Sequence, residues 1–148
     1  MSNDINPWRR KFIVLAENLG HLRDVPVPPL FDGFDKSLVV SVSVNNIVVD
    51  VIHADPDDSV GRILLQCRVA GLRGPFSGDA MRKALVLNQH LAHNQAGMYG
   101  LDARTKELVY CLQTPLEHVN ASELMEMINA ATEMALVWRR EYPESLPS

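Results

Sequence analysis

The sequence has no apolar run approaching the roughly 20 residues that a membrane-spanning helix needs. Its first residues also lack the basic flank and apolar core of a signal peptide. Positive charge is not in excess, since 14 Lys and Arg residues stand against 18 Asp and Glu residues and give a formal net charge of −4. An acidic surface repels phosphate backbones. These absences predict a cytoplasmic protein that binds neither membranes nor nucleic acid.

Cysteine is scarce as well, and only Cys67 and Cys111 are present. Each lies inside an apolar, strand-like run. Two reduced, buried thiols suit a cytoplasmic protein better than a structural disulfide, although the sequence leaves the disulfide open. Neither cysteine has a sequence neighbour that marks a catalytic nucleophile.

The sequence does contain enough hydrophobic residues for one core. The chain has 148 residues, and 47% of them are hydrophobic. This composition is typical of a globular domain and not of a disordered chain. We predict a single domain over residues 1–148, with flexible ends at residues 1–6 and 143–148.

Three segments have apolar residues at helical spacing. The first begins at Asn6–Pro7, a good N-cap and first helical residue, and we predict that it ends at Gly20. The second covers residues 79–93. The third begins with a capping-box-like Asn120 and continues as an apolar stripe to Trp138.

Alternating apolar residues predict strands between these helices. A hairpin over residues 37–53 turns at Asn45–Asn46, because asparagine tolerates the positive φ that a two-residue turn needs. Residues 60–69 could be helical by period alone, but their short length and the preceding hairpin favour a third strand. A second hairpin over residues 98–113 turns at residues 102–105.

The predicted order is therefore helix, three strands, helix, two strands, helix. The hairpins make a mostly antiparallel, twisted five-stranded sheet, so we predict an α+β fold whose three helices cover one side of the sheet. Prolines at positions 26, 28 and 29 make the link before the sheet stiff and extended.

No motif in the chain makes a convincing active site. The acidic loop from His53 to Asp58 lacks the spacing, central glycine and final glutamate of a calcium loop, so a solvated turn is the better interpretation. His90 and His93 lie three residues apart on a helix, but no further ligand completes a zinc set. Ser77-Gly78-Asp79 lacks a glycine-rich phosphate loop and is interpreted as a helix cap. We predict no catalytic residue, metal or cofactor.

The stretch from Ser77 to Gln113 carries the most specific pattern. It is a helix with a Leu-Asn pair, a glycine, a short Gly-Leu-Asp strand, a turn and an alternating strand. These pieces are Leu87–Asn88, Gly97, Gly100–Leu101–Asp102, residues 104–106 and Leu108–Val109–Tyr110–Cys111–Leu112. In a small acidic chain with this element order, the pattern resembles the class I chaperones of bacterial type III secretion systems.

The resemblance implies a bacterial, cytoplasmic homodimer that has no catalytic activity and uses no cofactor. Such a dimer binds the N-terminal segment of a secreted effector in an extended, non-globular form. It keeps the effector soluble and ready for the secretion ATPase, which makes it a component of protein transport and virulence. The effector's apolar residues dock on exposed hydrophobic patches, and the effector can add a strand to the sheet edge.

The sequence also carries more apolar surface than one chain of this size can bury, which favours a binding module. By resemblance, the middle helix lies at the two-fold interface, and the first helix and the sheet take the effector. The predicted dimer interface comprises Met81, Leu85, Leu87, Asn88 and Leu91. The predicted effector-binding residues are Trp8, Ile13, Val14, Val40 and Val42.

Two other functions remain as alternatives. A chaperone-fold regulator would bind a folded partner instead of an extended effector. A small-ligand or enzyme domain of α+β type would need a closed pocket with converging polar groups, lined by residues such as His53, His90 or Cys111.

Overall fold

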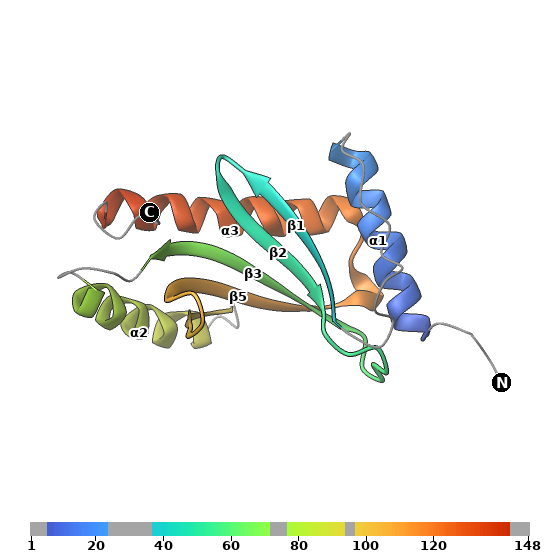
Figure 1. Ribbon diagram of the computed structural model, residues 1–148, viewed down its shortest axis with the longest axis horizontal. Coiled ribbons are helices and arrows are strands. Elements are labelled where there is room, and N and C mark those ends of the chain that lie inside the picture. The colour runs from blue at the N-terminus through green and yellow to red at the C-terminus, as the bar shows by residue number, and fades with distance from the viewer. Residues whose placement is uncertain (1–5, 24–36, 72–76, 94–96, 143–148) are drawn as a thin grey trace.

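The computed structural model describes residues 6–23, 37–71, 77–93 and 97–142, and within them three long helices pack with one five-stranded sheet (Figure 1). The predicted order and the α+β class are confirmed. The helices are α1 (Pro7–Arg23), α2 (Ser77–His93) and α3 (Ala121–Glu141), with a short 3₁₀ helix, η1 (Leu116–His118), before α3. The strands are β1 (Leu38–Val44), β2 (Ile47–His53), β3 (Arg62–Gly71), β4 (Met98–Asp102) and β5 (Glu107–Pro115).

The sheet has the strand order β1-β2-β3-β5-β4, and every neighbouring pair is antiparallel. Strands β1 and β4 are therefore its two edges. Both predicted hairpins form, and Asn45 and Asn46 adopt the expected positive φ values of 53° and 64° in the first turn. The segment that could have been helical by period is a strand, β3, as predicted.

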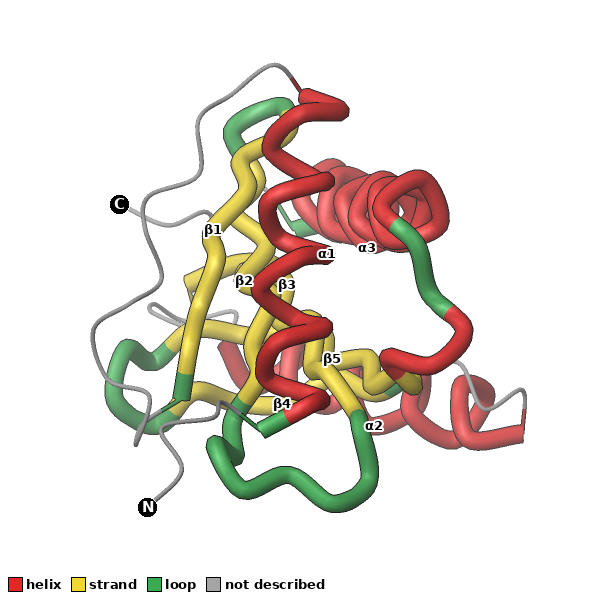
Figure 2. The backbone as a smooth tube through the Cα atoms, turned by 90° about the vertical axis from the view of Figure 1, so that its right-hand side faces the viewer, coloured by secondary structure: helices red, strands yellow, loops and turns green. Residues whose placement is uncertain are grey.

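The helices lie at three different places around the sheet. Helix α3 lies along one face, over β2 and β3, and α1 crosses near its N-terminal end (Figures 1 and 2). Helix α2 lies beside β4, at the opposite end of the molecule from α1. This arrangement covers one face of the sheet with α3 and one edge with α2.

Local capping signals in the sequence are confirmed, but one helix end is not. Asn6 Oδ1 accepts the main-chain N–H of Trp8 at 2.9 Å, and Asn120 Oδ1 accepts that of Glu123 at 2.8 Å. The predicted end of the first helix at Gly20 is wrong, because α1 continues to Arg23 with Gly20 buried inside the fold. The middle helix begins at Ser77, two residues earlier than predicted.

The two cysteines are free thiols, as the composition favoured. Cys67 pairs with Tyr110 across β3 and β5, while Cys111 pairs with Gln66, so the cysteines occupy alternate positions of the ladder. Their side chains therefore point to opposite faces of the sheet and cannot form an intrachain disulfide without a register change. The proline-rich link at residues 25–30 and the predicted flexible ends, apart from Asn6, lie outside the described residues.

Candidate partner-binding surfaces

The first candidate surface lies where α2 runs beside the edge strand β4. Met81, Leu85 and Leu101 are 44%, 68% and 48% exposed. Together they border a shallow groove of about 110 Å³. We name these three residues the α2–β4 surface. Three large apolar side chains exposed around one hollow are typical of an interaction site.

Asn88 lines the same groove, but its side chain is engaged within the chain. Its Nδ2 donates to the carbonyl oxygen of Tyr99 at 3.0 Å, and the N–H of Tyr99 donates to its Oδ1 at 2.6 Å. The other side of β4 pairs with β5, so Asn88 supplies hydrogen bonds to the outer edge of the sheet. Helix α2 thus closes part of the β4 edge.

The structure separates the remaining residues of the predicted dimer interface. Leu87 is half-buried and faces α3, where it lines a second groove. Leu91 is also half-buried and packs against the core. The interface stays a prediction, and the structure brings Met81, Leu85 and Asn88 to one surface.

The predicted effector-binding residues of α1 lie at different depths. Trp8 is half-buried over Gly61, and Lys11 Nζ lies 5.7 Å from the centroid of its ring. Ile13 is half-buried against the core, whereas Val14 is exposed. Among these three predicted residues, Val14 offers most surface to a partner.

The assignment of Val40 and Val42 to an exposed binding surface is wrong. Both side chains are buried in the hydrophobic core, on the face of β1 that the helices cover. Alternation along a strand places Val39 on the opposite face, where it is 47% exposed. Val39 is therefore the apolar side chain of this strand that a partner can reach.

The outer edge of β1 has main-chain groups available for pairing. In a two-residue hairpin the residues flanking the turn, Val44 and Ile47, bond to each other, and alternate residues then face outward. The outward residues are Val39, Ser41 and Ser43. The carbonyl of Ser43 accepts a hydrogen bond from Arg23 Nη2 at 2.9 Å, which supports this register.

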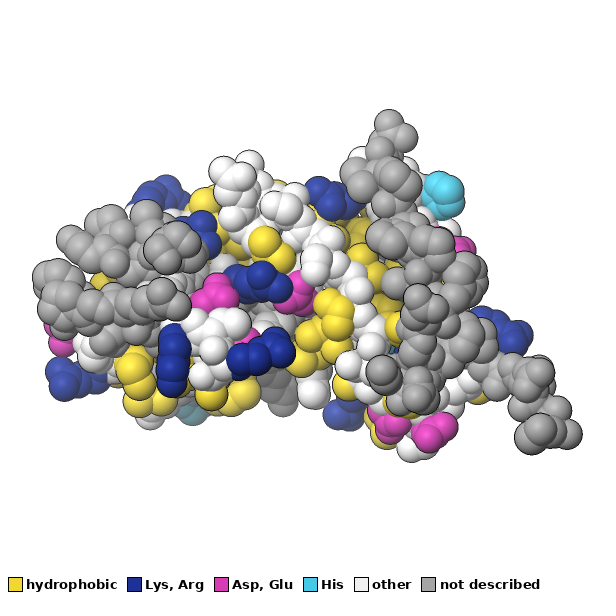
Figure 3. Space-filling view, in the orientation of Figure 1, with side chains coloured by type: hydrophobic (Ala, Val, Ile, Leu, Met, Phe, Trp, Pro, Cys, Tyr) yellow, Lys and Arg dark blue, Asp and Glu magenta, His cyan; other side chains and the backbone are white. Residues whose placement is uncertain are grey.

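The face of the sheet opposite α3 is mixed in character. Asp50 accepts a hydrogen bond from Ser41 Oγ at 2.6 Å, and its other oxygen lies 3.1 Å from Arg68 Nη2. Figure 3 shows charged side chains among hydrophobic ones over this part of the molecule. This face is therefore not a continuous apolar patch.

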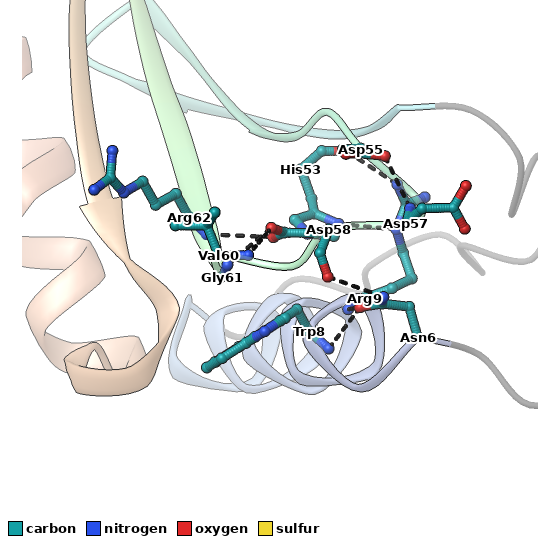
Figure 4. A network of polar contacts seen from close by, with 10 residues as sticks. All are labelled: Asn6, Trp8, Arg9, His53, Asp55, Asp57, Asp58, Val60, Gly61 and Arg62. Carbon is teal, nitrogen blue, oxygen red and sulfur yellow. Dashed lines mark hydrogen bonds and ion pairs between the residues drawn. The ribbon is translucent and has the colours of Figure 1, made fainter.

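A buried polar network fastens α1 to the loop between β2 and β3 (Figure 4). Arg9 and His53 are 1% and 0% exposed. Arg9 Nε donates to His53 Nδ1 at 2.8 Å, and His53 Nε2 lies 2.8 Å from Asp58 Oδ2. Because Arg9 can only donate, the imidazole accepts at Nδ1 and donates from Nε2.

Asp58 organises the acidic loop by accepting main-chain hydrogen bonds. The N–H groups of Val60 and Gly61 both donate to Oδ1 at 2.8 Å, and that of Arg62 donates to Oδ2 at 3.3 Å. Burial alone would raise the pKa of Asp58, but these bonds and that from His53 together lower it to about 2. Hydrogen bonds within the chain therefore fix the shape of the loop, which agrees with its interpretation as a turn.

Arg9 is the residue of this network that the sequence reasoning missed. It lies on the buried face of α1 with Phe12 and Ala16, at spacings of three and seven residues. An arginine on an apolar stripe needs a buried partner, which is a usable signal. Phe12 also stacks on His53, with ring centroids 5.5 Å apart.

The grooves and side-chain clusters of the described part of the chain bear on the alternative of a small-ligand or enzyme domain. Within it, no three His, Cys, Asp or Glu side chains come close enough together to hold a metal ion. Among the residues that the structure describes, no helix is long and apolar enough to cross a bilayer. The two grooves described here are lined by neither His53, His90 nor Cys111.

Comparison with solved structures shows where this fold recurs. The chain is similar to a chain of the ExsC–ExsE complex, with 17% identity and a TM-score of 0.70 over 92% of this chain and 96% of that one. It is also similar to a chain of the HopA1–SchA chaperone–effector complex, with 15% identity and a TM-score of 0.66 over 93% and 99%. A third likeness is to the Yersinia pestis type III secretion chaperone SycH in complex with a YscM2 fragment, with 15% identity and a TM-score of 0.56 over 84% and 97%.

At these identities the likeness concerns the fold alone. No curated protein matches the sequence. Residues 33–139, which are more than half of the chain, match the family of the Tir chaperone protein. The match spans the whole sheet, helix α2 and most of α3. The chain therefore belongs to the Tir chaperone protein (CesT) family.

Proposed function

We propose that the protein is a cytoplasmic type III secretion chaperone that binds the N-terminal region of a secreted effector and keeps it soluble and non-globular. The family match over residues 33–139 carries this proposal. The similar folds found in the ExsC–ExsE and HopA1–SchA complexes support it. The effector is then delivered to the secretion apparatus, and the chaperone itself performs no chemistry.

The two sheet edges differ in a way that favours β1 for adding an effector strand. At β4, Asn88 already occupies the N–H and carbonyl of Tyr99. At β1, the outward groups of Val39 and Ser41 have no hydrogen-bonded neighbour strand in the described part of the chain. An extended segment can pair with such an edge and gain main-chain hydrogen bonds independent of its sequence.

Exposed apolar side chains near this edge suit an extended effector. Val39 projects from β1 itself, and Val14 and Leu22 are exposed on α1. Arg23, the residue after Leu22, reaches the β1 backbone, so the end of α1 lies beside the strand. We propose Val14, Leu22 and Val39 as effector contacts. Trp8 and Ile13 hold α1 in place by packing against the hydrophobic core.

The α2–β4 surface is proposed as the dimer seam. Met81 and Leu85 lie one turn apart on α2, and Leu101 faces them from β4. A two-fold axis brings the same patch of each copy together, so a compact apolar patch can bury itself.

Isolation of the natural partner tests the proposed function. The tagged chain is expressed in its native host, captured, and each co-purifying protein is identified and trimmed from either end. We expect one or a few secreted proteins bound through their N-terminal regions in a protease-sensitive, extended form. Capture of a folded partner that binds through a compact domain would support the regulatory alternative instead.

A further inference from the structure

A second groove, of about 410 Å³, lies between α2 and α3 and is separate from the α2–β4 surface. The two grooves share only Tyr99 among their lining residues. We name the second one the α2–α3 groove. It is lined by Lys83, Leu87, Tyr99, Glu133, Met134, Val137, Trp138 and Glu141.

Helix α3 supplies most of this lining as one stripe. The residues from Glu133 to Glu141 span about two turns, or about 12 Å of helix. Val137, at the centre of the stripe, is 50% exposed although it is apolar. Trp138 is buried beside it, and its Nε1 has no hydrogen-bond partner among the described residues. A groove of this size and lining accommodates one or two bulky apolar side chains.

The charges around the stripe are unbalanced. Glu133 and Glu141 stand at its two ends, and Lys83 faces them from α2. Neither glutamate forms an ion pair with any residue of the described ranges, and neither does Lys83. Two carboxylates against one ammonium give the groove an acidic rim, which favours a partner with positive charge.

We propose that the α2–α3 groove binds a short amphipathic segment of the effector, in which bulky apolar side chains are flanked by Lys or Arg residues. The apolar side chains enter beside Val137, and the basic residues pair with Glu133 and Glu141. This inference rests on the proposed function. It adds a second attachment point, at the opposite end of the molecule from α1, to the strand added at β1 (Figure 1).

Site-specific cross-linking tests the groove directly. A Val137→Cys variant, made in a Cys111→Ser background, is labelled with a benzophenone maleimide and illuminated with the effector that co-purifies from the host. Cys67 is 0% exposed and burial raises its pKa to about 12, so we expect that thiol to stay unlabelled in the folded protein. Glu126→Cys, on an exposed position of α3 about three turns away, is the matched control.

We expect Val137→Cys to cross-link to an effector segment with apolar residues between basic ones, and Glu126→Cys to give little product. A cross-link to a second copy of the chain would overturn the proposal and assign the groove to self-association. If the effector stays bound but no cross-link forms at position 137, the proposed role of the groove is wrong and the proposed function is unaffected. If no effector is captured, both the proposed role of the groove and the proposed function are wrong. The isolation of the natural partner from the host reveals that outcome separately.

Charge reversal gives an independent measurement. Glu133→Lys combined with Glu141→Lys changes two exposed helical positions and should leave the helical content intact. We expect the affinity for the effector to fall at least about fivefold and to lose part of its salt dependence. Glu126→Lys alters the net charge on the same helix outside the groove and should leave the affinity within about twofold. Equal affinities for the reversed and wild-type proteins would overturn the proposed charge recognition.

Discussion

The side chain of Asn88 pairs with the main chain of Tyr99 as a neighbouring strand would. One hydrogen bond runs from Nδ2 to the Tyr99 carbonyl at 3.0 Å, and the other from the Tyr99 N–H to Oδ1 at 2.6 Å. A single side chain thereby fixes α2 against the sheet and occupies the outward main-chain groups of Tyr99 on the β4 edge.

The Asn88→Ala substitution removes both hydrogen bonds and tests how much they contribute to stability. Tyr99 would lose a donor and an acceptor, and water can replace them only in part because the site is half-buried. We expect a loss of about 1–2 kcal/mol in the free energy of unfolding, measured by urea titration. Gln89→Ala changes the exposed neighbour and should cost less than about 0.5 kcal/mol. Equal stabilities of the two variants would contradict the role given to Asn88.

Leu85→Glu should disrupt the proposed dimer. Leu85 is the most exposed residue of the α2–β4 surface, so a charge there costs the folded monomer little but would be buried in a dimer. We expect the wild-type protein to be a dimer at low micromolar concentration by light scattering, and the variant to be monomeric. Val86→Glu is the control, since Val86 is exposed on α2 outside the groove. A dimeric Leu85→Glu protein would rule out this seam.

A strand-edge variant tests where the effector adds to the sheet. Val39→Pro removes an outward N–H that bonds to no other strand in the described chain, and proline is tolerated at such edge positions. We expect the melting temperature to change little while effector affinity falls about tenfold or more. Val39→Thr keeps the N–H and should bind more tightly than the proline variant. If both variants bind alike, the contribution of strand pairing at β1 is refuted.

Gly61 should be intolerant of any side chain. Its φ is +77°, and a Cβ placed there would lie 2.5 Å from the ring of Trp8. Gly61→Ala is expected to destabilise the protein by about 2 kcal/mol or more, because both the backbone and the Trp8 ring must move. Gly78→Ala is the matched control, since a Cβ there meets nothing within 4 Å at the start of α2. That control should be neutral or stabilise by up to about 1 kcal/mol.

Asp58 should make stability depend on pH in acid. Its pKa is lowered from 3.8 to about 2 in the folded protein, so the unfolded chain takes up the proton first as the pH falls. The stabilisation is therefore complete above about pH 4 and is lost towards pH 2, at a cost of about 1–2 kcal/mol.

Comparing Asp58→Asn with wild type at pH 6 and at pH 2.5 measures this contribution. The difference in unfolding free energy should be large at pH 6 and shrink at pH 2.5. Asp57→Asn, at the exposed neighbouring position, should show no such convergence. A wild-type advantage that stays constant over this range would contradict the assignment.

Local sequence signals were sufficient to predict the order of the helices and strands. The caps at Asn6 and Asn120 and the turn at Asn45–Asn46 depend on residues no more than three positions apart, and all three form as predicted. The end of α1 was not predictable in this way. Gly20 has the low helical propensity of a terminating residue, but burial of α1 against the rest of the fold outweighs that preference.

The sequence by itself determined the family-like pattern, the antiparallel hairpins and the excess of apolar surface. Only the tertiary structure decided which of these apolar residues a partner can reach. Alternation in β1 defines two faces, but the packing of the helices makes Val40 core and Val39 surface. Asn88 likewise acquires its role from a strand eleven residues further along the chain, because only the folded chain brings it to the Tyr99 backbone.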